Sequence, residues 1–202
     1  MTSKITSLLL AMLSIGLLGL NTSCKKVCGE NLPQYTLSTG QRAWATPFAA
    51  TTAWRFRNAA GYERTYRVSK SESQTMGSGG ASKLSVCPSY YQEYFFADFE
   101  RTDSTLTGYT KGIYHLQLAA NNVGNTNGHL MQWNHADFLL AIDEVEVGQK
   151  VLAPATFGGR TYPAVLESTS QKFAPLVLHL YLTKAEGVVA FDDQYGTLWT
   201  RI

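Results

Sequence analysis

Two histidines and a carboxylate, His129, His135 and Asp137, stand close together in the segment 127–137. Neutral imidazoles and carboxylates are common ligands of zinc and other divalent metals, and they also serve hydrolases. On one continuous strand these side chains would share a face but spread over about 26 Å, at ~3.3 Å per residue, too far for one ion. Polar residues at loop edges are therefore the favoured interpretation. The alternative is a metal-dependent or serine-type hydrolase that uses this region, with Ser89 as a possible nucleophile.

The sequence contains none of the common catalytic motifs. It lacks a G-x-S-x-G elbow, an H-E-x-x-H pair, a Walker loop and a G-x-G-x-x-G run after a strand. The Gly-rich run at 77–80 lies in a polar segment that no apolar strand precedes. We therefore expect no catalytic residues, no metal and no cofactor.

Aromatic residues are the more informative group, and five of them are candidate ligand-binding residues: Trp44, Trp54, Tyr91, Tyr94 and Trp133. Large flat rings with polar tips line apolar grooves and stack on sugar rings, but the same residues fill the cores of β-domains. Both interpretations stay open at this point. The segment 90–99 carries aromatic bulk on both faces, so we expect one face to pack on the core. The other face would then need a covering loop, a partner or a ligand.

Alternation of apolar and polar residues is the dominant pattern, and it predicts β-strands that position these side chains. Trp54 and Phe56 alternate with arginines, and after a turn at 58–61 the alternation resumes through 62–68. Further alternating segments lie at 113–118, 145–151, 161–167 and 178–183, several of them joined by Gly-containing turns. The sequence therefore predicts one all-β domain built as an antiparallel meander.

Two segments lack this pattern. The polar, Gly- and Ser-rich segment 69–85 has no residues to bury, so we expect a flexible loop there. The short apolar run 137–142 does not distinguish a strand from a helix.

The first residues are typical of a secretory signal peptide. Lys4 supplies a positive charge, and residues 8–20 form an apolar stretch that is too short for a membrane span of roughly 20 residues. Composition agrees with a folded, exported domain. The chain has 202 residues, 45% of them apolar, and a formal net charge of +2. These values exclude disorder by composition and give no indication of nucleic-acid binding.

The segment Leu20-Asn21-Thr22-Ser23-Cys24 resembles a relaxed bacterial lipobox, as found in small uncharacterised envelope lipoproteins of the Bacteroidota type. Two later segments are similar to motifs of the same lipoproteins: GGRTYPAVL at 158–166, and the hairpin and closing residues Tyr181, Lys184, Gly187, Val188, Val189 and Trp199. The resemblance implies lipidation of Cys24 after cleavage, and a strongly curved sheet, either a half-barrel or a β-sandwich. Lys25, in place of Asp, favours the outer membrane over the inner one.

With Cys24 lipidated, Cys28 and Cys87 remain as an even pair in an oxidising compartment, and we expect them to form a disulfide. Two free thiols are the alternative. The expected organisation is a signal peptide at 1–23, a tether at 24–33 and a single β-rich domain at 34–202. These features favour a lipid-anchored envelope protein whose β-domain is a non-enzymatic binding module for a hydrophobic ligand, a glycan or an envelope partner.

Overall fold

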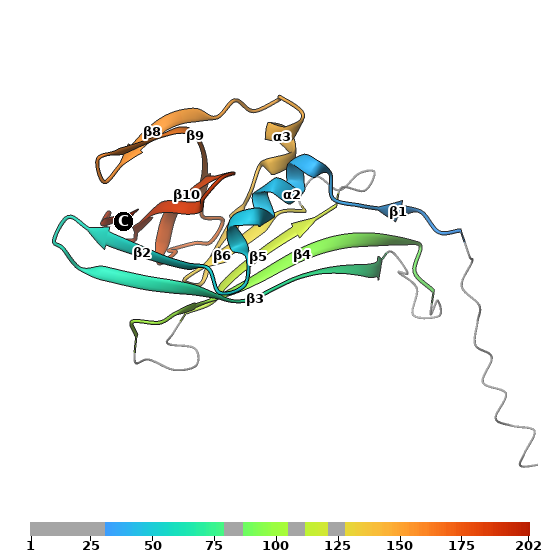
Figure 1. Cartoon of the computed structure of the whole chain (residues 1–202), viewed down its shortest axis with the longest axis horizontal. Coiled ribbons are helices and arrows are strands. Elements are labelled where there is room, and N and C mark those ends of the chain that lie inside the picture. Colours follow the sequence, from blue (N-terminus) through green and yellow to red (C-terminus); the bar gives the residue numbers. More distant parts are fainter. Residues whose placement is uncertain (1–30, 79–86, 105–111, 121–127) are drawn as a thin grey trace, which may run out of the picture.

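The structure is a computed structural model, shown whole in Figure 1, and it describes residues 31–78, 87–104, 112–120 and 128–202. These residues form an antiparallel sheet that curls into a half-barrel. This confirms the predicted all-β class and, of the two expected shapes, the half-barrel. The predicted signal peptide at 1–23 and most of the tether lie outside the described residues.

The described elements are twelve strands and three short helical segments. The strands are β1 (Gln34–Tyr35), β2 (Ala53–Asn58), β3 (Glu63–Ser78), β4 (Tyr90–Arg101), β5 (Tyr114–Ala119), β6 (Leu130–Trp133), β7 (Ala136–Leu139), β8 (Ala153–Phe157), β9 (Arg160–Thr169), β10 (Val177–Thr183), β11 (Gly187–Asp193) and β12 (Leu198–Arg201). The helical segments are α2 (Thr39–Ala45), the 3₁₀ helix η1 (Thr46–Phe48) and α3 (Ile142–Glu146).

Two antiparallel meanders make up the sheet. The first contains β2 to β7 in chain order and the second contains β8 to β12. They are joined because β12 pairs with β2, with Thr200 opposite Arg57. The short strand β1 adds in parallel to the beginning of β4. The predicted meander is therefore correct within each half of the chain.

The sheet curls until β7 reaches the far end of β9. The Ser168 hydroxyl donates to the backbone carbonyl oxygen of Leu139 at 2.8 Å. The backbone N–H of Gln171 donates to the backbone carbonyl oxygen of Asp137, also at 2.8 Å. These bonds come from a side chain and a loop rather than from a regular strand pair. The two ends of the sheet are thus held together without a complete barrel ladder.

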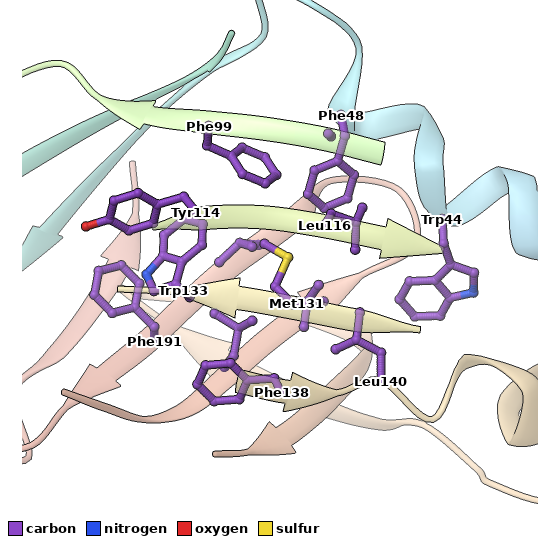
Figure 2. Close-up of a cluster of buried hydrophobic side chains, with 14 of the residues drawn as sticks. Trp44, Phe48, Phe99, Tyr114, Leu116, Met131, Trp133, Phe138, Leu140 and Phe191 are labelled. Atoms are coloured by element: carbon purple, nitrogen blue, oxygen red, sulfur yellow. The ribbon is translucent and has the colours of Figure 1, made fainter. Parts of the chain in front are cut away.

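The concave side of the sheet is filled by aromatic and aliphatic side chains (Figure 2). Trp133 lies at its centre and is fully buried. Its ring centroid lies 4.7 Å from that of Tyr66, 5.2 Å from that of Tyr114 and 5.4 Å from that of Phe191, mostly in the tilted or edge-on arrangements that aromatic pairs prefer. The alternation of the sequence places these rings on one face of each strand, so curling the sheet brings them together.

The expected flexible loop at 69–85 is wrong for residues 69–78, which belong to β3. This part of β3 pairs with β4 from Lys70 opposite Asp98 to Ser78 opposite Tyr90. Strand β4 supplies an aromatic-rich partner, and the ribbon runs beyond the filled interior, so polar side chains on β3 need no burial. Residues 79–86 lie outside the described residues.

The alternation at 145–151 predicts a strand that the structure does not contain. Ile142–Glu146 forms the short helix α3 instead, with Ile142 buried. The apolar run at 137–142 splits between the end of β7 and the start of α3. Alternation over so few residues does not distinguish a strand from a helix, because contacts with α2 decide which residues are buried.

Gly187 begins β11 with φ +73, and a Cβ there would lie 3.0 Å from the Trp54 ring and 3.2 Å from Phe48. We expect Gly187→Ala to lower the free energy of unfolding by about 2–5 kcal/mol, because backbone strain and overpacking add. Urea denaturation measures this change. The matched control is Gly61→Ala: its φ is +85 with nothing within 4 Å of the new Cβ, so it should lose only about 1–2 kcal/mol. Equal losses in the two variants would contradict the predicted clash.

Candidate functional site

Two of the five aromatic candidates, Trp54 and Trp133, are core residues. Their side chains are 2% and 0% exposed. The Trp54 ring packs edge-on against Phe48, with 5.1 Å between centroids. The prediction that these two residues bind a ligand is therefore wrong, because the curl of the sheet turns their face inward.

Trp44 lies on α2 and is as buried as Trp54, with 2% of its surface exposed, but it also borders a surface cleft. Helix α2 begins with a capping box, in which the Ser38 hydroxyl accepts from the Gln41 amide at 3.1 Å and the Gln41 side chain accepts from the Ser38 amide at 2.7 Å. The helix covers one end of the concave side, and Trp44 points from it toward Leu116 and Leu140 (Figure 2). The small accessible part of Trp44 lines a surface cleft of about 240 Å³.

We call this hollow the α2 cleft. Its walls come from α2, α3, β9 and the turn between β10 and β11, and its lining residues are Trp44, Val145, Glu146, Leu152, Tyr162–Ala164 and Thr183–Glu186. Aromatic and aliphatic side chains form most of this lining. The volume is just below the roughly 300–1,000 Å³ of sites for drug-sized ligands, so the cleft suits one ring or a short acyl group.

Glu146 is the central polar group of the α2 cleft. Its Oε1 accepts from the Trp44 indole nitrogen at 2.8 Å and pairs with the Lys184 ammonium at 2.7 Å. Burial by itself raises the pKa of Glu146, but the hydrogen bonds from Lys184 and Trp44 outweigh it and hold the pKa below its ordinary value of 4.5. Gly40 allows this approach, since a Cβ there would lie 1.8 Å from Oε2 of Glu146.

The second carboxylate of the cleft, Glu186, is also paired. Arg160 binds it with two hydrogen bonds of 2.9 and 2.5 Å. The Arg160 guanidinium also lies 4.8 Å from the centroid of the Tyr162 ring, and the Tyr162 hydroxyl is buried with no hydrogen-bond partner. Both negative charges of the cleft are thus paired with neighbouring cations. The apolar side chains are the part of its lining that remains open to contact.

Tyr94 and Tyr91 lie on β4, away from the cleft. Tyr94 is on the outer face, where its ring lies nearly parallel to that of Phe96, with centroids 5.7 Å apart. The His115 ring continues this row at 5.7 Å from Phe96, and its Nδ1 is 2.6 Å from Asp98. Half-buried rings of this kind provide stacking surface, as the aromatic bulk on both faces of β4 predicts. Tyr91 is half-buried where β4 pairs with β1.

The structure does not bring His129, His135 and Asp137 together. His129 points toward the core, and its Nε2 lies 2.8 Å from Oδ1 of Asp143. His135 forms the turn between β6 and β7, with φ +63, and Asp137 points outward, where it contacts Lys172 at 3.2 Å. These placements give no support to a hydrolytic or metal site formed by the three residues.

The remaining predicted site residues concern the N-terminus and the disulfide. Cys24 and Cys28 lie outside the described residues, so lipidation and the Cys28–Cys87 bond stay predictions. No helix in the described ranges has the length and apolar character to cross a bilayer. Within the same ranges, no group of three or more His, Cys, Asp or Glu side chains is arranged to hold a metal ion.

The polar residues of the α2 cleft were not identified by sequence analysis. Glu146 occupies a polar position of the strand predicted at 145–151, so it gives no sign of a site. Lys184 is singled out only as part of the hairpin motif that resembles envelope lipoproteins. Trp44 and Glu146 are 102 positions apart in the chain, and Glu146 and Lys184 are 38 apart. Such a cluster has no local spacing to reveal it.

Comparison of the chain with protein-family models, with curated proteins and with solved structures finds no significant match.

The lowered pKa of Glu146 predicts a pH-dependent contribution to stability. A carboxylate whose pKa is depressed by folding stabilises the folded state above its unfolded pKa, and this stabilisation is lost as pH falls through the folded pKa. We expect Glu146→Gln to reduce the free energy of unfolding by about 1–2 kcal/mol at pH 7, and the difference from the parent to shrink below pH ~4.5. Urea denaturation between pH 3 and pH 7 measures it. Glu144→Gln, an exposed neighbour, is the control. A difference that is constant with pH would contradict the role of this charge.

Proposed function

We propose that this protein is a lipid-anchored lipoprotein of the bacterial outer membrane, tethered through Cys24, and that its β-domain is a non-enzymatic binding module. The ligand is hydrophobic, and its apolar group occupies the α2 cleft. The signal-like segment and the lipobox resemblance support the anchor. The cleft supports the binding role.

The observation that carries the binding role is the combination of an apolar wall with charges that are already paired. Glu146 is matched by Lys184 and Glu186 by Arg160. A ligand therefore gains from covering Leu152, Val145 and Ala164, and it needs no charge of its own. A charged ligand would have to compete with these pairs.

The filled interior also favours a site at the surface. In lipid carriers with a barrel fold, the ligand lies inside the barrel. Here the concave side is occupied by Trp133, Phe56 and Phe191, each fully buried. A hydrophobic group therefore finds its place at the rim, under α2, rather than at the centre of the sheet.

The anchor is tested by metabolic labelling with a palmitate analogue in a bacterium that processes lipoproteins. We expect label in the parent chain and none in Cys24→Ala, because the thioether and the cleavage site both depend on this sulfur. Cys28→Ala, four residues further on, should keep the label. Incorporation that persists in Cys24→Ala would exclude Cys24 as the anchor.

The cleft is tested with a neutral, single-ring probe, 4-fluorotoluene, followed by fluorine NMR. Ala164 is exposed and lines the cleft, so Ala164→Phe fills it without disturbing the core. We expect the probe to bind the parent and at least tenfold more weakly to Ala164→Phe. Ala60→Phe, which adds the same ring at an exposed turn, should bind as the parent does. Equal binding by all three proteins would exclude the cleft as the site.

A further inference from the structure

Strand β3 runs well past β2, and this leaves one of its edges open. The pairing of β2 with β3 reaches Arg67, opposite Ala53. The next residue, Val68, is still covered, because its amide donates to Thr52 at 2.8 Å and its carbonyl oxygen accepts from Thr51 at 3.0 Å. Beyond Val68, β3 continues to Ser78 and pairs with β4 alone. In Figure 1 both strands extend toward the end of the molecule where β1 lies.

The ladder shows which backbone groups point to this open edge. On β4, the Tyr91 amide donates to Pro33 and the Glu93 carbonyl oxygen accepts from Ala120, so both residues bond away from β3. Their partners in an antiparallel pair must also bond away, and these partners are Gly77 and Thr75. The bonding direction alternates along a strand, so the backbone groups of Ser73 and Ser71 also point away from β4.

The amide and carbonyl groups of Ser71, Ser73, Thr75 and Gly77 therefore form a row along the open edge. No hydrogen bond links this row to another segment of the described residues. These residues are also largely exposed, with only Ser71 partly covered. Unpaired groups of this kind are a template for one more strand.

An apolar pocket of about 290 Å³ lies beside the open edge. Ser73 forms its border, and its walls include Leu37, Ala45, Ala49 and Phe95. A strand added to the edge would place alternate side chains on this face of the sheet, directly over the pocket.

The charge at the mouth of this pocket is already paired. Arg42 is held by Glu93 through two hydrogen bonds of 2.5 and 2.6 Å. The pocket therefore suits an apolar side chain rather than an acidic one.

Nothing in the edge segment prevents strand addition. Exposed edges in β-proteins are usually protected by proline or by charges that point inward. Strand β8, at one end of the sheet, contains Pro154. Residues 69–78 contain no proline, and the side chains on the pocket face are Ser71, Ser73 and Thr75. The charges of this segment are on the opposite face, where Lys70 and Glu72 pair with each other at 2.5 Å.

We propose that the open edge of β3, at residues 71–77, binds an extended peptide segment of a partner protein. The segment adds to the sheet as a strand, and one of its apolar side chains enters the pocket between α2 and β3. Backbone hydrogen bonds supply the affinity and the pocket supplies the selectivity. This site is separate from the α2 cleft, so it does not depend on the function proposed above.

The test begins with a random twelve-residue peptide library displayed on phage and selected against the full chain without its signal peptide. We expect enriched peptides in which apolar residues alternate with other residues. Their synthetic versions should slow hydrogen exchange of the Ser71, Ser73 and Thr75 amides. Absence of enrichment over an unrelated protein, or protection at another place, would overturn the proposal.

Two variants then locate the site. Ser73→Pro removes one edge-directed amide that the ladder with β4 does not use, so we expect at least tenfold weaker peptide binding, whereas Ser73→Thr keeps the amide and the affinity. Ala49→Phe fills the pocket from an exposed position and leaves every ladder bond intact, so it should also weaken binding at least tenfold even if Ser73→Pro fails to fold.

A third variant and a mass measurement complete the test. Ala164→Phe, in the α2 cleft, should not change peptide binding. Unchanged affinity in Ala49→Phe would overturn the proposal. A dimer that forms through the same edge, detected by analytical ultracentrifugation, would overturn it in favour of self-pairing.

Discussion

The structure depends on the filling of the concave side of the sheet by aromatic side chains around Trp133. A curved sheet is stable only when its inner face is covered, and here the cover is supplied by the sheet's own residues. Trp133, Phe56 and Tyr66 come from the first meander and Phe191 from the second, so the contacts of Phe191 with these three rings hold the two halves of the chain together. This packing leaves the rim and the edges of the sheet as the surfaces that remain open.

The two helices close the end of the half-barrel that the aromatic residues do not fill. Polar contacts fix them there. Asp143 on α3 accepts from the Gln41 side chain of α2 at 2.6 Å and lies 2.8 Å from His129 at the start of β6. Glu146, one turn further on α3, joins Trp44 to Lys184. Buried polar groups require partners with defined geometry, so these contacts set the position of α2 more closely than apolar packing alone.

Helix α2 is shared by both surfaces that we consider functional. Trp44 lines the cleft toward α3 and β9, whereas Ala45 and Arg42 line the pocket beside β3. Successive residues of a helix point in directions about 100° apart, so neighbouring positions of one short helix face two separate hollows. The two proposed sites therefore lie on different sides of α2.

The sequence alone determined which residues alternate, and through this the all-β class, the hairpin of β2 and β3, and the strands of the second meander. The same pattern did not show whether Trp54 and Trp133 would lie on the inner or the outer face of the sheet. Alternation defines two faces, and only the curl of the sheet decides which one is inside. It also missed residues 69–78 as a strand, since a polar ribbon that needs no burial has the composition of a loop.

Only the tertiary structure decided the pairing of β12 with β2, the contact of Glu146 with Trp44 and Lys184, and the open edge of β3. Each of these joins residues far apart in the chain, or follows from where a neighbouring strand ends. Local propensity carries no information about either, because both depend on the packing of the whole domain.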